Sequence, residues 1–498
     1  MAENGPSQAE RLPTGVPGLD TLMRGGFIKG GVYMVLGMPG AGKTILGNQV
    51  CFHHTSTGGR ALYVTLLAET HTRMISNLRS MKFFELSRIP DSLAYLSAYS
   101  VLEEGGLDAL LELIRKEIKS HRATLLILDG LVAAEEIAPT ERDFKKFIHG
   151  IQVTTGLMGC TSLLLTTGGG SGLKAEHTMV DGMLILRERT FGVRAVRELT
   201  VRKFRGSGHL RGPHSFDISD RGITVFPRLE TVVETEVPAS SAKERMAFGI
   251  KGLDAMLHGG IFVGSTLMLF GTPGSGKTLL GLHFLAEGAR KGERGHYFAF
   301  YDAPQRVRDQ ATSVGLALEP LMEKGTLELS FRPPLENLLD ELGTQLLHLI
   351  REKGIRRLFV DGFEALQRTV VHKPRIARFM AALVNECRSR GVTLLFSVET
   401  EFAFGPQLKF PVRGISMITE NILFLRCTEV GSELRRFISV LKLRTSEHDP
   451  ALREFQISRK GLSVGDPISN AQLLMSGLAQ ISPTQGASRK RRFKLRGK

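Results

Sequence analysis

The sequence predicts an α/β chain of two tandem domains, each built on a mainly parallel β-sheet flanked by helices. Three observations lead to this fold class. The 498-residue chain repeats itself with a period of about 234 residues. Short apolar runs alternate with helix-forming stretches in both halves. Each half also carries a glycine-rich loop directly after an apolar run, and strand, loop and helix in that order are typical of parallel sheets.

The repeat is clearest near the start of each half. One segment, GVPGLDTLMRGGFIKGGVYMVLGMPGAGKT, begins at Gly15, and its counterpart, GIKGLDAMLHGGIFVGSTLMLFGTPGSGKT, begins at Gly249, with roughly half of the positions identical. Residues 205–225 and 444–464 then align without gaps. We therefore expect a first domain over 1–230, a polar linker over 231–244, a second domain over 245–466 and a basic tail over 467–498.

The apolar runs read as buried strands. Strands of a parallel sheet are covered by helices on both faces, so they are continuously apolar rather than alternating. The clearest runs in the first half are Val32–Leu36, Ala61–Thr65, Leu125–Leu128 and Ser162–Thr166. Their alternation with helical stretches indicates βαβ units.

The two glycine-rich loops fit G-x-x-x-x-G-K-[ST], the P-loop pattern that binds nucleotide phosphates. Glycines let backbone N–H groups converge on the phosphates, and the helix that follows adds further N–H groups and a favourable dipole. The lysine reaches the β- and γ-phosphates, and the last hydroxyl ligates Mg²⁺. The expected ATP-binding residues are Gly37, Gly40, Gly42, Lys43 and Thr44, then Gly271, Gly274, Gly276, Lys277 and Thr278.

A carboxylate at the end of a buried strand should complete each magnesium site. LLILDG places Asp129 at such an end, 86 residues after the first P-loop lysine, and LFVDG places Asp361 84 residues after the second. Because the repeat supplies both aspartates at matching distances, we predict a metal role for them rather than a role in a turn.

Hydrolysis also needs a carboxylate that orients or deprotonates the attacking water. Gly130 and Gly362 follow the metal aspartates, so this group must come from elsewhere. In RecA-type ATPases, which these halves resemble, it closes the strand after the P-loop helix. Glu69 and Asp302 lie there, 26 and 25 residues after their P-loop lysines. We predict Glu69 as one catalytic base and the shorter Asp302 as a weaker one, so the second site would turn ATP over slowly.

Further paired motifs accompany the P-loops, namely the GLD…GG lead-ins and the segments VRKFRGSGH and VLKLRTSEH. With these motifs the chain resembles the KaiC family of double-domain RecA-like ATPases over residues 11 to 466, and Arg413–Ser458 follows the second domain of that family closely. The resemblance implies a homo-hexamer of two stacked rings, assembled by ATP, with each ATP at a subunit interface.

In that family a Lys-x-Arg pair late in each domain reaches the γ-phosphate held by the neighbouring subunit. The matching residues are Lys203 and Arg205, then Lys442 and Arg444. A guanidinium supplied in trans would neutralise charge that develops on the phosphoryl group. The alternative is that these basic residues lie on one exposed strand face.

The clock member of the family phosphorylates an adjacent serine and threonine near the second-domain interface. Ser416 and Met417 occupy the matching positions, so the serine acceptor is present and the threonine is missing. The paired glutamates that activate the acceptor correspond to Tyr301 and Asp302. The resemblance thus implies, at most, serine autophosphorylation of Ser416 and no two-site cycle.

We therefore expect a Mg-dependent ATP-binding and ATP-hydrolysing signalling protein, with serine/threonine autokinase activity in the second domain as an additional hypothesis and an unidentified protein partner. One alternative is a RecA/RadA-like DNA-dependent ATPase, which the net charge of +15 and the glycine-rich loop at 168–172 would suit. Aromatic residues make up only 7%, Trp is absent and no zinc-ribbon cysteines precede the ATPase, so we do not expect a nucleic-acid partner. The other alternative is an ATP-gated ring scaffold with little turnover.

Composition bears on the surroundings of the protein. Seven Lys or Arg residues lie between Arg489 and Lys498, and without them the net charge would be about +8. The four cysteines are far apart and lack C-x-x-C spacing, which favours free thiols in a reducing compartment. The N-terminus has no apolar signal core, and no apolar run approaches the roughly 18 to 20 residues of a membrane span. We expect a cytoplasmic protein without a membrane partner.

Overall fold

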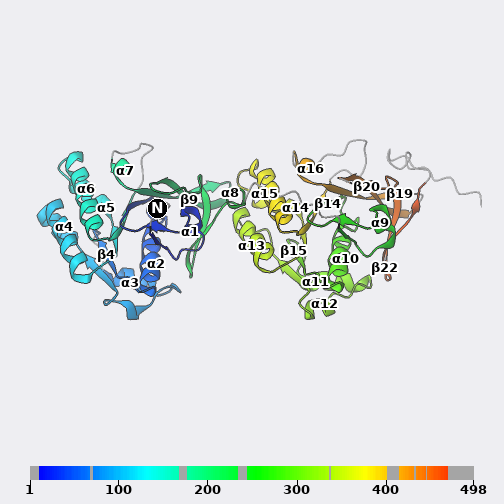
Figure 1. The fold of residues 1–498 in the computed structure, drawn as a ribbon, viewed down its shortest axis with the longest axis horizontal. Coiled ribbons are helices and arrows are strands. Elements are labelled where there is room, and N and C mark those ends of the chain that lie inside the picture. Colours follow the sequence, from blue (N-terminus) through cyan, green and yellow to red (C-terminus); the bar gives the residue numbers. More distant parts are fainter. Residues whose placement is uncertain are drawn as a thin grey trace, which may run out of the picture. The chain divides into compact units, whose positions relative to one another are not determined.

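The computed structural model describes the chain as two compact units that divide near Val232 (Figure 1). The described residues are 10–67, 71–167, 176–233, 244–335, 338–400, 414–430, 433–444 and 446–468. Most of the predicted linker and nearly all of the basic tail therefore lie outside them, and the domain limits given above stay predictions.

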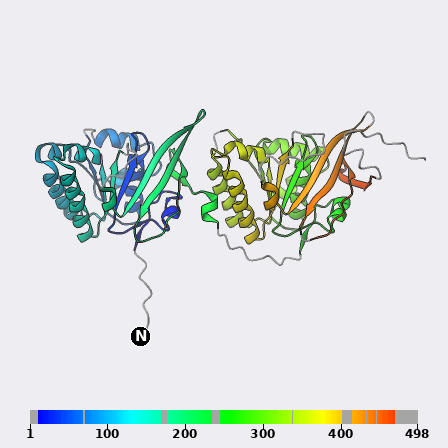
Figure 2. The same ribbon diagram turned by 90° about the horizontal axis from the view of Figure 1, so that it is seen from above.

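The predicted fold class is confirmed, because each unit is a nine-stranded, mainly parallel sheet flanked by helices (Figure 2). In the first unit the strand order is β11-β10-β9-β8-β3-β7-β6-β4-β5. Along the sheet, neighbouring strands pair in parallel from β5 through β4, β6, β7 and β3 to β8, and they pair antiparallel from β8 through β9 and β10 to β11. The antiparallel extension was not foreseen from the sequence.

The elements of the first unit have the following bounds. The strands are β1 (Arg11–Leu12), β2 (Phe27–Ile28), β3 (Val32–Gly37), β4 (Ala61–Thr65), β5 (Leu93–Ser97), β6 (Leu125–Asp129), β7 (Thr161–Thr166), β8 (Gly182–Phe191), β9 (Arg194–Phe204), β10 (His214–Ser219) and β11 (Gly222–Phe226). The helices are α1 (Leu19–Met23), α2 (Lys43–Ser56), α3 (His71–Leu78), the 3₁₀ turn η1 (Leu86–Arg88), α4 (Tyr99–His121), α5 (Leu131–Ile137), α6 (Glu141–Leu157), α7 (Glu176–Met179) and α8 (Leu229–Val232).

The second unit repeats this order with β16-β15-β17-β18-β14-β19-β20-β21-β22. Its strands are β12 (Arg245–Met246), β13 (Ile261–Phe262), β14 (Thr266–Gly271), β15 (Gly295–Ala299), β16 (Leu327–Phe331), β17 (Arg357–Asp361), β18 (Thr393–Glu399), β19 (Asn421–Val430), β20 (Glu433–Leu443), β21 (Arg453–Ser458) and β22 (Gly461–Pro467). Its helices are α9 (Lys251–Met256), α10 (Lys277–Arg290), α11 (Pro304–Ser313), α12 (Glu319–Glu323), α13 (Leu339–Glu352), α14 (Phe363–Thr369), α15 (Arg375–Ser389) and α16 (Ile415–Ile418).

Strand β3 shows why the apolar runs are continuous. Val32 and Met34 belong to the core under α4 and α6, whereas Tyr33 and Val35 belong to the core under α2. Successive side chains of a strand point to opposite faces, so a sheet covered on both faces needs apolar residues at every position. The run at 32–35 is therefore buried throughout.

Two further expectations concern single features of the chain. All four cysteines are free; Cys51, Cys160 and Cys387 are buried, while Cys427 is only partly buried. Within the described ranges, none of the helices has both the length and the apolar character of a bilayer span.

Candidate nucleotide sites

Each P-loop connects the central strand of its sheet to the first long helix. Helices α2 and α10 begin at Lys43 and Lys277. The residues before them, Gly42 and Gly276, have φ angles of 97° and 98°. Because side chains disfavour this left-handed region, glycine is needed at the turn that aims the helix N-terminus at the loop. The helix dipole and free N–H groups there favour an anion.

The predicted metal residues meet in both units. The Thr44 hydroxyl donates to Oδ2 of Asp129 at 2.9 Å, and the Thr278 hydroxyl donates to Oδ2 of Asp361 at 2.8 Å. The threonine and aspartate are 85 and 83 residues apart in sequence, so this contact comes from the sheet order, which places the ends of β3 and β6 near each other. A hydroxyl and a carboxylate therefore converge beside each P-loop.

Each of these aspartates also accepts a hydrogen bond from a buried tyrosine that the sequence motifs did not predict. Tyr63 and Tyr297 donate to the same Oδ2 atoms of Asp129 and Asp361, both at 2.7 Å. Burial, and then the charge of the aspartate, raises the pKa of each tyrosine well above its usual value. The signal was present in the sequence, because both tyrosines lie 20 residues after their P-loop lysines.

The P-loop lysines lie folded over their own loops. Nζ of Lys43 donates to the carbonyls of Gly37 and Met38 at 2.7 and 3.1 Å. Nζ of Lys277 donates to the carbonyls of Gly271 and Thr272 at 3.0 and 2.9 Å. Burial lowers the pKa of both lysines. Both ammonium groups are thus held at the phosphate loop.

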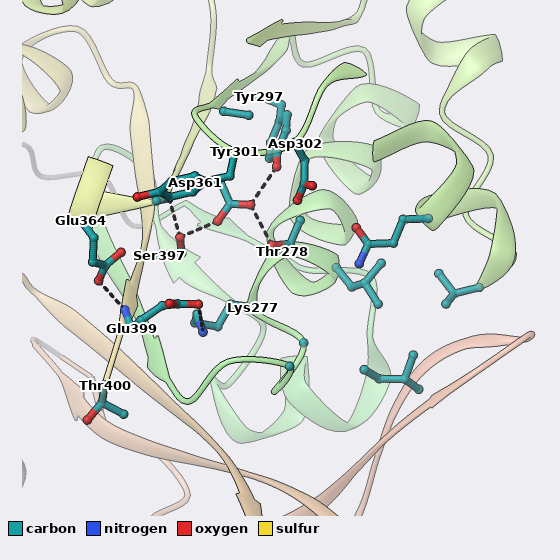
Figure 3. A pocket seen from close by; sticks show the side chains of 18 of the residues that line it. Lys277, Thr278, Tyr297, Tyr301, Asp302, Asp361, Glu364, Ser397, Glu399 and Thr400 are labelled. Carbon is teal, nitrogen blue, oxygen red and sulfur yellow. Dashed lines mark hydrogen bonds and ion pairs between the residues drawn. The ribbon is translucent and has the colours of Figure 1, made fainter. Parts of the chain in front are cut away.

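The second site opens into a cavity of about 1080 Å³, which is large enough for a nucleotide (Figure 3). Lys277, Thr278 and Asp361 line it together with Asp302. Asp302 lies on the Tyr297 side of the cavity in Figure 3, and its Oδ1 is 3.3 Å from Nε of Arg306.

Three further cavity residues escaped sequence reasoning, because no local motif marks them. Ser397, Glu399 and Glu364 line the cavity. The Ser397 hydroxyl donates to Oδ1 of Asp361, and Oε1 of Glu399 lies 3.6 Å from Nζ of Lys277. These residues come from the end of β18 and from α14, which the sheet brings to the P-loop.

Several predicted features lie outside the described residues. Glu69, the expected base of the first site, is one of them, as are the glycine-rich loop at 168–172 and the basic tail after residue 468. Ser416 is described on the short helix α16, where its backbone carbonyl accepts a 2.7 Å hydrogen bond from Nζ of Lys442.

The Lys-x-Arg pairs bind the short helices of their own units. Lys203 and Arg205 donate to the carbonyl of Thr178 at 2.7 and 2.9 Å. In the second unit, Lys442 donates to the carbonyls of Ser416 and Thr419. Arg444 donates to the carbonyl of Met417 at 3.3 Å.

These pairs lie at the end of the sheet away from the P-loop of the same unit. Lys203 pairs with Met183 on β8, and β8 runs parallel to β3 with Gly182 beside Tyr33 and Leu186 beside Gly37. Lys203 is therefore level with the start of β3, whereas the P-loop leaves from its end. The second unit has the same register.

Comparison with known proteins agrees with this geometry. The family model described as "ATPase: KaiC" matches residues 12–230 and 246–469. The chain is 29% identical to a circadian clock oscillator protein KaiC of Picosynechococcus over 96% of this chain and 93% of the relative. It is 29% identical to the protein of that name from Rippkaea orientalis, covering 97% and 93%. It is 27% identical to circadian clock protein KaiC3 of Synechocystis, covering 94% of each.

Proposed function

Because the chain belongs to the KaiC family of ATPases, we propose that each of its two units binds one Mg·ATP and that the ATP state of the chain governs its binding to a signalling partner. The first unit is the main hydrolytic one in this proposal, with Glu69 as its base. The clock names of the relatives favour a signalling role over DNA-dependent motor activity.

One observation carries the proposal. A P-loop lysine, a threonine hydroxyl and an aspartate at the end of a strand converge in the same way in both units, although the hydroxyl and the aspartate are more than 80 residues apart. Such a cluster at the start of a helix supplies cationic, hydroxyl and carboxylate groups where a nucleotide's β- and γ-phosphates would lie.

The residues present fit a magnesium ion. Mg²⁺ usually takes one or two protein oxygens and completes its shell with water and phosphate. Thr44 with Asp129, and Thr278 with Asp361, would hold it, and the bound ion would neutralise charge on the phosphates. The described side chains contain no cluster of three His, Cys, Asp or Glu that could bind a metal by protein groups alone. A site that depends on the nucleotide suits this arrangement.

The proposal is tested by Lys43→Ala and Lys277→Ala in the full chain. We expect each variant to retain one bound nucleotide where the parent chain retains two, because each removes one phosphate-binding ammonium. Lys43→Ala should also abolish most ATP turnover. Lys119→Ala, at an exposed position of α4, is the matched control. Unchanged turnover in Lys43→Ala would exclude the first unit as the hydrolytic one, and absent nucleotide in the parent chain would refute the whole proposal.

We further propose a homo-hexamer in which Lys203 and Arg205, then Lys442 and Arg444, contact the γ-phosphate held by a neighbouring copy. Their position supports this, since each pair lies at the far end of the sheet from the P-loop of its own unit. A cation that cannot approach its own nucleotide can serve one bound by the next subunit.

Two finer points complete the proposal. Serine/threonine autokinase activity would use Ser416, which is half-buried beside Lys442, and phosphate on Ser416 after incubation with Mg·ATP, read by mass spectrometry, is the test. A cytoplasmic location accords with four cysteines that form no disulfide.

A further inference from the structure

The second nucleotide site contains two carboxylates whose matching positions in the first unit are neutral. Glu399 is the last residue of β18 and lies level with Gly271, the first residue of the P-loop. The register of β3 and β7, continued by one residue, gives Thr167 as the matching residue of the first unit. Glu364 comes three residues after Asp361, where the first unit has Val132 after Asp129. The difference is therefore specific to one half of a duplicated chain.

Glu399 pairs with the P-loop lysine. Its Oε1 lies 3.6 Å from Nζ of Lys277, whose side chain is only 8% exposed, while the Glu399 side chain is 53% exposed. The carboxylate is thus the solvent-accessible partner of a buried ammonium at the P-loop. For Lys43, the described residues supply only loop carbonyls as hydrogen-bond partners.

The sheet order sets the place of Glu399 relative to the metal aspartate. Strand β18 lies between β14, which carries the P-loop, and β17, which ends at Asp361. Ser397 and Glu399 are two residues apart on a strand, so they point to the same face. Because Ser397 bonds Asp361, that face is the one that holds the metal residues (Figure 3).

Glu364 fixes the backbone that carries Glu399. Its Oε1 accepts a 2.6 Å hydrogen bond from the Glu399 N–H. Burial, together with the like charge of Glu399, raises the pKa of Glu364. Glu364 is a positioning residue in this arrangement, because it contacts the main chain of Glu399 rather than the P-loop.

From this geometry we infer that Glu399 is the catalytic base of the second nucleotide site. The inference rests on the proposed function, since it requires ATP at Lys277. An incoming γ-phosphate replaces the Glu399 carboxylate as the partner of Lys277 and leaves that carboxylate beside the phosphate. There it accepts a proton from water as the water oxygen bonds the γ-phosphorus and the bond to the β–γ bridging oxygen breaks. The products are ADP and inorganic phosphate, and the proton resides on Glu399.

Asp302, the base predicted from sequence, is the alternative for this step, because it lines the same cavity. It lies on the Tyr297 side of the cavity in Figure 3, and Arg306 is its nearest charged partner, at 3.3 Å. Glu399 also has the longer side chain and already contacts the group that binds the γ-phosphate. The two candidate bases are distinguished by single substitutions, because only the substitution of the true base should lower the turnover of ATP at the second site.

The test uses the full chain carrying Lys43→Ala, so that turnover reports the second site. Glu399→Gln should lower the single-turnover rate of ATP hydrolysis about 100-fold or more, the usual contribution of a general base. ATP should bind Glu399→Gln at least as tightly as the parent, because the amide no longer pairs with Lys277 as a charge. Glu352→Gln, which alters an exposed carboxylate of α13, is the matched control.

The outcomes separate the inference from the proposed function. If the Lys43→Ala chain binds no ATP at the second site, the proposed function of that site fails. If it binds ATP and hydrolyses it equally fast with Glu399→Gln, the inference alone fails. The inference also fails if the bound ATP is never hydrolysed, if Glu399→Gln weakens binding in proportion to the rate, or if Asp302→Asn loses turnover while Glu399→Gln does not.

Discussion

Asp129 and Asp361 receive different numbers of hydrogen bonds, and this difference predicts unequal effects of removing one tyrosine hydroxyl. Tyr63→Phe and Tyr297→Phe each delete a 2.7 Å bond to an aspartate while keeping the ring. Among the described side chains, Asp129 then retains the Thr44 donor alone, whereas Asp361 retains Thr278 and Ser397. Both tyrosines are at most 1% exposed, so water does not replace the lost donor freely.

The magnitude follows from the charge of the acceptor. A hydrogen bond to a charged group contributes about 1.5 to 3 kcal/mol, against about 1 kcal/mol for a neutral pair. We expect the upper value for Tyr63→Phe and the lower value for Tyr297→Phe. In a unit of this size, about 3 kcal/mol corresponds to a fall in Tm of roughly 6 to 12 °C. The loss applies to the nucleotide-free protein.

Scanning calorimetry of the full chain measures the loss, and hydrogen exchange read by mass spectrometry assigns it to a unit. Tyr95→Phe is the internal control, since the Tyr95 hydroxyl donates to the neutral Oδ1 of Asn48 at 2.7 Å in the first unit. If Tyr63→Phe destabilised the protein no more than Tyr95→Phe, or less than Tyr297→Phe, the reasoning from acceptor charge would be wrong.

Three further outcomes are expected. Burial lowers the pKa of His296 to about 4. Between pH 6.5 and pH 4 the unfolded chain therefore binds a proton at this histidine that the folded unit does not bind. The free energy of unfolding should fall by up to about 3 kcal/mol as the pH is lowered from 6.5 to 4. Urea titrations across this range should show a weaker loss in His296→Leu. Arg205→Ala should lower steady-state turnover about 100-fold or more while isothermal calorimetry shows ATP still bound; equal turnover would argue against the finger role. Gly281→Ala would place Cβ 2.1 Å from the Phe359 ring and should lower the free energy of unfolding by about 1 to 3 kcal/mol. The loss should exceed that of Gly47→Ala, whose Cβ would have its nearest contact at 3.1 Å. Similar urea midpoints for the two variants would contradict this prediction.

The parts of the sites that sequence could predict are those encoded locally. A P-loop is a continuous motif, so Lys43, Lys277 and their threonines follow from spacing alone. The metal role predicted for Asp129 and Asp361 was based on an apolar strand that ends in a carboxylate, a pattern that both halves of the repeat contain. The structure places each aspartate within hydrogen-bond distance of its P-loop threonine, and the metal role of both residues stays a prediction.

Residues contributed by register could not be found in the same way. Glu399 matters because β18 lies between the P-loop strand and the aspartate strand, and a single sequence does not state which strands are neighbours. Comparison of the two halves of the repeat did not reveal Glu399 either, because such a comparison highlights only the positions that both halves share. Glu399 and Ser397 distinguish the second half, where the first has Thr167 and Leu165.

The separation of P-loop and Lys-x-Arg pair at opposite ends of one sheet gives each unit a polarity. Under the proposed trans role, each unit contains both a P-loop and a Lys-x-Arg pair, but the pair cannot contact the nucleotide bound by its own P-loop. In each of the two units, a copy added to a row completes the phosphate site of one neighbour and leaves its own site incomplete, so the row ends in an incomplete site until its last member contacts its first. Head-to-tail contacts of this kind either close into a ring or extend into an open filament. Only a closed ring gives every bound nucleotide a Lys-x-Arg pair from a neighbouring copy.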